Sequence, residues 1–268
     1  MRPQVENLES SSVPASPWDS SGIGRGASIR PLSVDEETGA TTALIDLPVG
    51  FTHAPIACDA SQDWLLLEGE IQVGDRRLHP GAYSYYPSRL IQPSRSVLRR
   101  ATVLAIFDTK PVYSTDHGNL SKPPEIIEYT DIWAIPWEDP LQVSEPSESF
   151  RSGVLIKKLR VNKTTGEQVY LAGLMAGWYM PGLEVHGYEE NYTLSGDVHI
   201  GEVGGGRGYT MTPGSYMSRP ANIPHGPIVT KNGNVNLVHV LSRMVINYQM
   251  HPQAERMIRT HLETYPWR

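Results

Sequence analysis

The chain repeats its own sequence at a fixed separation, and this property restricts its fold more than any other. The segment TGATTALIDLPVGF at 38–51 corresponds to TGEQVYLAGLMAGW at 165–178. The segment WLLLEGEIQVGD at 64–75 corresponds to NYTLSGDVHIGE at 191–202. Both pairs of segments are separated by the same number of residues, which we call the first offset. Gly39 and Gly166, and likewise Gly69 and Gly196, are separated by this same number of residues.

The correspondence continues beyond an insertion, VGGGRG, in the second copy. The insertion lengthens the separation to a second offset, at which PGAYSYYP at 80–87 corresponds to PGSYMSRP at 213–220. Several glycines and prolines coincide independently, which indicates two copies of one structural unit.

Within each copy, short strand-like runs are interrupted by turns. GEIQVGD at 69–75 alternates apolar and polar residues, as a half-buried strand does, and VNLVHVLSR at 235–243 is expected to be a closing strand. Turn signals recur at intervals of about 8–12 residues, which is typical of an antiparallel sandwich or barrel. We therefore predict an all-β fold made of two tandem barrels.

Composition excludes several classes of function. The chain of 268 residues has a formal net charge of −6 and shows no basic stripe, which argues against nucleic acid as a partner. Its one cysteine, Cys58, permits neither an intramolecular disulfide nor a cysteine zinc site. No apolar signal core or run of about 20 apolar residues occurs, so we expect a cytoplasmic protein with no membrane partner.

The pattern also predicts domain boundaries. Residues 1–27, rich in Ser, Pro and Gly, are expected to be a flexible arm, or one that orders only by docking. The first barrel is expected at 28–110, a linker at 111–150 and the second barrel at 151–250. A short helix with one apolar face is predicted at 251–268.

The repeated unit resembles the cupin barrel, a small double-sheet jelly roll, so the chain resembles a bicupin. The resemblance covers residues 33–245 and includes the RmlC-like and ChrR-type tandem cupins. The cupin pattern has a His-x-His pair, then a Glu with a Gly seven residues later, and finally P-x-G-x-x-H. In such proteins these two His, the Glu and the last His usually bind one metal ion inside the barrel.

The second copy matches much of this pattern. Glu189 lies seven residues before Gly196 and so takes the position of the motif's Glu. The segment PANIPH at 220–225 has the spacing of the second motif, with Asn222 in place of its Gly, so His225 takes the final histidine position.

The start of the motif departs from the usual form. EVH stands where His-x-His is expected, so the resemblance implies Glu184 and His186 as ligands. Only two residues separate His186 from Glu189, where three is usual, and the usual spacing would instead select Glu190. Neighbouring residues of a strand point to opposite faces, so only one of Glu189 and Glu190 should reach the ion. The distance to Gly196 favours Glu189.

Alternation puts Glu184 and His186 on one face of a strand, and buried carboxylates are costly without a compensating cation. Imidazole together with carboxylate suits Fe(II), Mn(II), Zn(II), Ni(II) or Co(II). A carboxylate-rich set favours Fe(II) or Mn(II).

The first copy lacks such a set. Gln62 corresponds to Glu189, Gln92 corresponds to His225, and Ile56 and Cys58 take the two histidine positions. We therefore expect a first barrel that holds no metal, with Cys58 as a small buried residue.

Several further polar residues of the second copy could face the cavity: Tyr179, Tyr192, His199, Arg219 and His239. His239 interrupts the apolar run LVHVL and is a candidate acid/base or substrate contact, the alternative being a hydrogen-bonded core histidine. Arg219 could pair with a substrate carboxylate or lie on the outside of the barrel. Tyr192 completes the candidate catalytic set.

The resemblance implies a metal-dependent enzyme, with oxygenase (dioxygenase-like) chemistry on a small oxygenated or carbonyl-bearing substrate favoured over hydrolase or isomerase chemistry. EVHGYEENYTLSG is also similar to the metal segment of the ureidoglycine aminohydrolase family, a Mn(II) bicupin family, which keeps a hydrolase or lyase as an alternative. A metal-bound sensor, as in ChrR-type cupins, is the alternative from another class. Cupins often pair edge strands, so a homodimer is also an expectation.

Overall fold

The structure is a computed structural model of the whole chain. It describes residues 2–18, 23, 26–114, 125–138, 153–180, 183–185, 187–201, 208–242 and 247–249, with the backbone alone for 183–185 and 247–249. The chain divides into two compact units. The first contains Met1–Pro3 and Ser10–Ile135, and the second contains Gln4–Glu9 and Pro136–Arg268.

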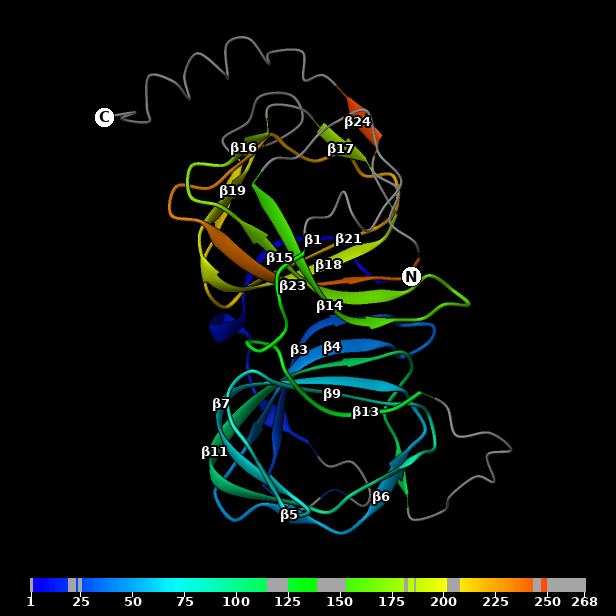
Figure 1. Ribbon diagram of the computed structural model, residues 1–268. Coiled ribbons are helices and arrows are strands. Elements are labelled where there is room, and N and C mark those ends of the chain that lie inside the picture. Colours follow the sequence, from blue (N-terminus) through cyan, green and yellow to red (C-terminus); the bar gives the residue numbers. More distant parts are fainter. Residues whose placement is uncertain are drawn as a thin grey trace. The chain divides into compact units, whose positions relative to one another are not determined.

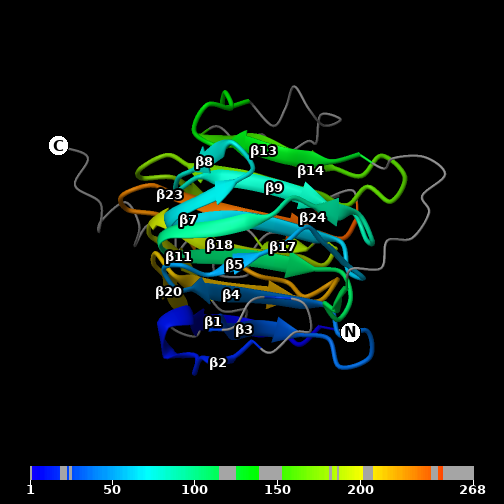
Figure 2. The ribbon, with the colours of Figure 1, turned by 90° about the horizontal axis from the view of Figure 1, so that it is seen from below.

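The first unit consists of two antiparallel sheets. A nine-stranded sheet has the order β13-β9-β7-β11-β4-β3-β2, with β5 paired to β11 and β8 paired to β7 (Figure 2). A three-stranded sheet has the order β10-β6-β12. The bounds are β2 Ser16–Pro17, β3 Ser28–Val34, β4 Thr41–Leu47, β5 Thr52–His53, β6 Ile56–Cys58, β7 Gln62–Val73, β8 Arg76–Leu78, β9 Ala82–Tyr86, β10 Ile91–Gln92, β11 Arg95–Phe107, β12 Tyr113–Ser114 and β13 Ile127–Asp131.

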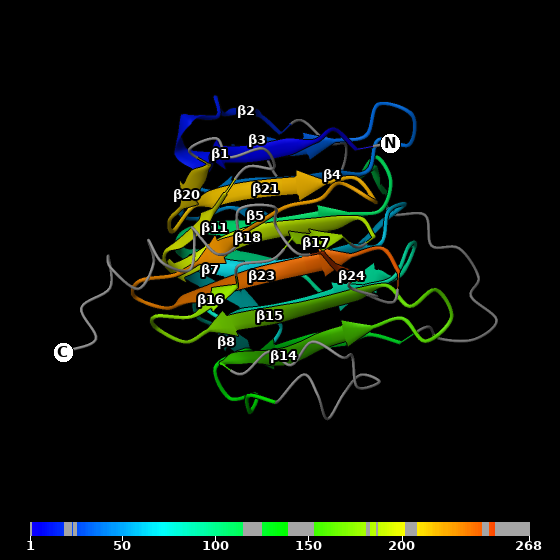
Figure 3. The same ribbon diagram turned by 90° about the horizontal axis from the view of Figure 1, so that it is seen from above.

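The second unit has the same plan. A six-stranded sheet has the order β1-β21-β18-β23-β15-β14 (Figure 3), with a four-stranded sheet β16-β22-β19-β20 and a two-stranded sheet β17-β24. The bounds are β1 Val5–Glu9, β14 Val154–Val161, β15 Gln168–Leu174, β16 Tyr179–Met180, β17 Leu183–Val185, β18 Glu189–Gly196, β19 Val198–Ile200, β20 Tyr209–Met211, β21 Ser215–Arg219, β22 Ile228–Val229, β23 Asn234–Val240 and β24 Asn247–Gln249.

The two units repeat each other strand by strand. At the first offset, β4 coincides with β15 and β6 with β17, at both ends of each strand. At the second offset, beyond the insertion, β9 coincides with β21 in the same way. Gly69 and Gly196 both have positive φ, +91° and +77°, at the bend of their strands. The internal repeat predicted from sequence and the all-β fold are therefore confirmed (Figure 1).

Both units gain strands that the repeat does not contain. β1, from the segment expected to be an arm, pairs with β21 of the second unit. β13, from the segment expected to be a linker, pairs with β9 of the first unit, at the position equivalent to β21. β2 and the buried Trp18 also join the first unit. The segment that precedes Trp18 thus contributes strands to both units, and the first unit extends past the expected boundary at 110.

A cluster of apolar side chains lies in the interior of each unit. The first core gathers large side chains such as Phe51, Trp64 and Phe107, and the second gathers Met180, Met211, Met217 and Ile228. The predicted helix at 251–268 lies outside the described residues. In the described part of the chain, no helix has the length and apolar character that a membrane span requires.

Candidate functional site

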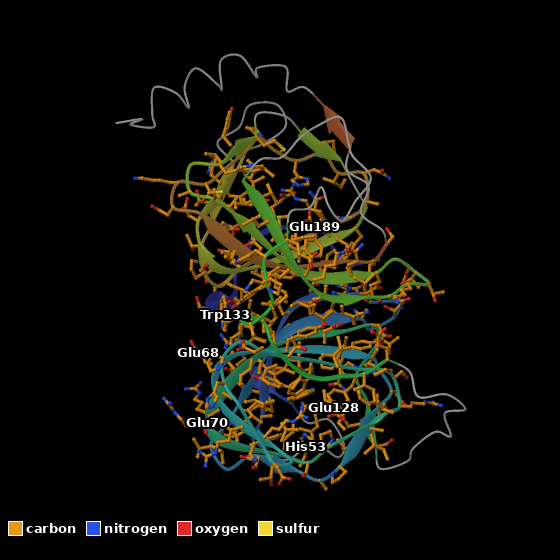
Figure 4. The ribbon with its side chains drawn as sticks, viewed as in Figure 1. His53, Glu68, Glu70, Glu128, Trp133 and Glu189 are labelled. Carbon is orange, nitrogen blue, oxygen red and sulfur yellow. The ribbon has the colours of Figure 1, made fainter. Side chains whose placement is uncertain are left out.

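The register of β18 separates Glu189 from Glu190. Asn191 lies directly opposite Met217 of β21, and Met217 belongs to the apolar interior cluster of the second unit. Residues directly opposite in an antiparallel pair share a face, and residues two apart in a strand share it too. Glu189 therefore faces the interior, and Glu190 faces the other side of the sheet. Glu189 is labelled in the second unit in Figure 4.

Glu189 is placed among apolar walls. Its exposure is 8%, and the interior cluster on its face is formed by Met180, Val198, Ile200, Met211, Met217 and Ile228. A carboxylate in such surroundings is costly to keep charged unless a cation or hydrogen bonds compensate it. Glu189 is thus a buried carboxyl group on an apolar wall, where a cation or hydrogen-bond donors would stabilise its charged form.

His225 is buried in the turn region between β21 and β22, with an exposure of 3%. The turn is shaped by Asn222, which takes the place of the motif's glycine and has φ of +67°. Arg89, at the equivalent position of the first unit, has φ of +62°. Both copies thus keep the left-handed turn that the motif's glycine usually supplies, and Asn is among the residues that tolerate it.

The remaining two candidate ligands lie outside the described side chains. Glu184 is the middle residue of β17, opposite Tyr248, and His186 follows this strand. At the first offset, Glu184 corresponds to Ala57, the middle residue of β6. The two neighbours of Ala57, Ile56 and Cys58, belong to the apolar core of the first unit. Among the residues whose side chains are described, no group of three or more His, Cys, Asp or Glu is arranged to hold a metal.

The structure puts His239 and Tyr192 on the other face of the sheet from Glu189. His239 lies opposite Glu190, and Tyr192 is two residues from Glu190 in β18. His239 Nε2 lies 3.0 Å from Glu167 Oε1, and its Nδ1 lies 3.7 Å from Glu190 Oε2. The hydroxyl of Tyr188 donates a hydrogen bond to Glu190. His239 therefore belongs to a polar row, formed with Glu167, Glu190 and Tyr188, that is separate from Glu189.

Charge is compensated within that row. Arg160 donates to both carboxylate oxygens of Glu167, at 2.7 and 3.2 Å. Burial raises the pKa of Glu167, but hydrogen bonds from His239 and Arg160 outweigh it and lower that pKa to about 2. This arrangement matches the hydrogen-bonded core histidine that was the alternative for His239.

Arg219 shares the face of Glu189, its direct neighbour across the β18–β21 pair. Its Nη2 donates to Glu6 Oε2 of β1 at 2.6 Å and also to the Tyr209 hydroxyl. Burial raises the pKa of Glu6, but the bond from Gln4 and the charge of Arg219 lower it overall. Nε and Nη1 of Arg219 are buried without an acceptor among the described residues. Two donors of this guanidinium thus remain available to an anionic group.

The first unit differs at each equivalent position. Gln62 is fully buried and accepts a hydrogen bond from Tyr113 at 3.0 Å. Gln92 is buried and accepts one from Arg95, also at 3.0 Å. Cys58 is buried in the core as expected, and burial raises its pKa to about 11. Gln62, Gln92 and Cys58, which the motif places at ligand positions, are thus neutral, whereas the first offset places the acidic Asp59 opposite His186.

Arg95 is the interior residue that the sequence analysis missed. It is 7% exposed and lies over the ring of Trp64, with Cζ 4.3 Å from the ring centroid. At the second offset it corresponds to Ile228, a core residue of the second unit. The sequence does contain a signal for this: Arg95 aligns with Ile228, and an apolar residue at that position indicates that it faces the interior.

Comparison with known proteins gives a family and a fold. A family model described as a domain of unknown function, DUF4437, matches residues 22–246. No curated protein matches the chain.

Several solved structures are similar. One is a Nostoc punctiforme protein provisionally assigned as a dioxygenase, with 19% identity and a TM-score of 0.75 over 93% of this chain and 84% of that chain. Oxalate decarboxylase from Bacillus subtilis, in a structure at pH 4.6, has 17% identity and a TM-score of 0.56 over 98% and 84%. A structure of the same enzyme from work on its Mn(II) centres has 17% identity and a TM-score of 0.56 over 98% and 85%. These likenesses confirm two tandem cupin barrels.

Proposed function

The chain belongs to the family described as domain of unknown function DUF4437, and from this membership and the site's geometry we propose a metal-dependent cupin enzyme whose site is the second barrel. Glu189 carries the proposal: it is a buried carboxylate that faces an apolar interior, where the first barrel has the neutral Gln62. The two residues occupy equivalent positions of the fold and differ in charge.

His225 supplies a second donor in this proposal. Its equivalent in the first barrel, Gln92, lines a cavity in the interior of that barrel. The repeat therefore supports an inward direction for His225, and the motif supports His186 and Glu184 as the other donors. A buried imidazole and a buried carboxylate fit a divalent transition ion, and we favour Fe(II) or Mn(II) over Zn(II), Ni(II) or Co(II).

The ion would supply Lewis-acid polarisation of a bound oxygen atom, or activation of O₂. The chain's own contribution is binding and exclusion of water. Arg219 lies beside Glu189, and its free Nε and Nη1 would orient an anionic or carbonyl oxygen of a small substrate. The walls formed by Met180, Met211 and Met217 exclude water, which strengthens these polar interactions.

We favour an oxygenase acting on a small oxygenated or carbonyl-bearing compound. Elemental analysis of protein expressed with added iron or manganese should find close to one metal per chain. His225→Ala should lose this metal, whereas Gln92→Ala, its match in the first barrel, should keep it. A wild-type protein without metal, or loss of metal in Gln92→Ala alone, would overturn the proposal.

Oxygen consumption then decides the reaction class. An oxygen electrode with diketones, flavonols and other phenolics should show turnover that requires the bound metal. Retention of Zn(II) as the native ion would contradict O₂ activation, because zinc has no redox chemistry.

The free donors of Arg219 favour a second candidate, a hydrolase, isomerase or lyase that binds a substrate carboxylate and uses the metal without redox chemistry. Its test is turnover of small carboxylic acids and ureido compounds under strictly anaerobic conditions. Turnover that stops without O₂ would exclude this candidate.

A further inference from the structure

In the described part of each barrel, one buried arginine faces the interior, and only one of these two has an acidic partner. Arg219 of the second barrel is paired with Glu6. Arg95 of the first barrel makes no ion pair with any Asp or Glu in the described part of the chain. The exposed Glu128 lines a neighbouring cavity with Arg95 and does not pair with it. A buried guanidinium without an anion is costly, so its retention needs an explanation.

Several groups around Arg95 are hydrogen-bond donors. The guanidinium cannot accept, so the amide oxygen of Gln92 must face it, and the amide nitrogen of Gln92 is left as a donor. This nitrogen and the indole nitrogen of Trp64 are both buried without an acceptor among the described residues. Donors gathered around a cation are complementary to an anion.

A cavity connects the central members of this group. It is lined by Trp64, Gln92, Arg95, Tyr113 and His53 together with apolar side chains. Burial and the charge of Arg95 lower the pKa of His53 to about 4, so this imidazole is neutral at pH 7 and Arg95 provides the positive charge. Figure 4 labels His53 and Glu128 in this unit.

The cavity is small. It has room for a group about the size of one water molecule, with Trp64 and Tyr86 stacked near the guanidinium at 4.3 and 5.6 Å. Large substrates are excluded by this size. A halide is close to this size, whereas formate, with three heavy atoms, would require the side chains that line the cavity to move apart.

We propose that the interior of the first barrel is a binding site for a small anion, of halide or formate size, held by Arg95, Gln92 and the indole nitrogen of Trp64. The site needs no metal and does not rest on the function proposed for the second barrel. It gives the first barrel a ligand of its own, where the sequence indicated only a barrel without metal.

The test is thermal unfolding of the full chain in the presence of EDTA, with sodium formate or chloride compared with sodium gluconate at equal ionic strength. Gluconate is too large for the cavity and controls for salt. The midpoint should rise saturably with formate, chloride or both, because a ligand of the folded state stabilises it. Comparison of the two arms identifies the preferred anion.

Substitutions test whether the rise in the unfolding midpoint depends on Arg95. Arg95→Met should abolish the shift, whereas Arg77→Met, whose side chain is 68% exposed, should keep it. Trp64→Phe keeps the ring and removes one donor, so the apparent affinity should fall by about threefold to tenfold. This variant carries the test if Arg95→Met does not fold.

Crystals soaked in sodium bromide provide a direct check, since an anomalous peak should lie in the cavity beside the Arg95 guanidinium, the Gln92 amide nitrogen and the Trp64 indole nitrogen. Absence of a saturable shift in the wild-type protein, an equal shift in Trp64→Phe and Gln92→Leu, or bromide peaks only at the surface would each overturn the proposal.

Discussion

Glu189 and Glu190 are neighbours in sequence with opposite surroundings. Glu189 faces the apolar interior, while Glu190 accepts a hydrogen bond from Tyr188 and lies near His239. If Glu189 is the ligand, Glu189→Gln should weaken binding of Mn(II) by at least about 100-fold, since even indirect partners of a metal contribute 10- to 100-fold. Glu190→Gln should leave the affinity within about threefold. Competition against a fluorescent chelator measures both, and the reverse order would assign the metal to the other face.

Glu167 gives a pH-dependent prediction. Its pKa is lowered from 4.5 to about 2 because the bonds from His239 and Arg160 outweigh burial. A folded-state pKa below the unfolded one contributes stability above about pH 4.5, and this contribution is lost as the pH falls toward 2. We expect Glu167→Gln to lose about 2 kcal/mol at pH 7, discounted for the partial exposure of the side chain. The stability of the Glu167→Gln variant should then fall less steeply below pH 4.5 than the stability of the wild-type protein.

Urea unfolding at pH 7, 4.5 and 3 measures this difference. Glu36→Gln is the control, because Glu36 is an exposed carboxylate of the first unit. An equal loss at all three pH values would show that the carboxylate contributes by packing and not by charge.

At the scale of elements, strand bends depend on single glycines. Gly196 has φ of +77°, and a Cβ there would lie 1.9 Å from the carbonyl oxygen of Gly233. Gly177 has φ of +78° with nothing within 4 Å of a Cβ. We expect Gly196→Ala to destabilise the fold by about 3 kcal/mol, from backbone strain and overpacking together, and Gly177→Ala by about 1 kcal/mol from strain alone. Equal effects in denaturant unfolding would show that the bend relaxes around a side chain.

The elements also show what the sequence could predict. Strands such as β4 and β15 follow from glycine spacing and alternation, because both signals are local. The pairing of β1 with β21 does not, because VENLE has no strong alternation and its partner lies in the other half of the chain. Alternation separates Glu189 from Glu190, but only the core position of Met217 shows which of them faces inward.

At the scale of the whole molecule, one added strand belongs to the barrel that is more distant from it in sequence. β1 precedes the first barrel in sequence and completes the second, while β13 follows the first barrel and completes the first. Both cover the edge of an equivalent strand, β21 or β9. An uncovered edge presents unpaired backbone groups and invites association with another chain. The covered edge of the second barrel therefore depends on the first residues of the chain, and so does the ion pair between Arg219 and Glu6.

Removal of residues 2–9 tests this dependence. The deletion leaves β21 as an edge strand and takes Glu6 from Arg219, so the second barrel should unfold at a lower temperature and the protein should form larger assemblies. Calorimetry and light scattering measure the two effects. The deletion also removes Arg2, which donates to Thr42 Oγ1 and the Phe107 carbonyl in the first unit. Arg2→Gln alone controls for that loss, because it keeps β1 in place. If it reproduces the whole effect of the deletion, β1 is dispensable to the second barrel.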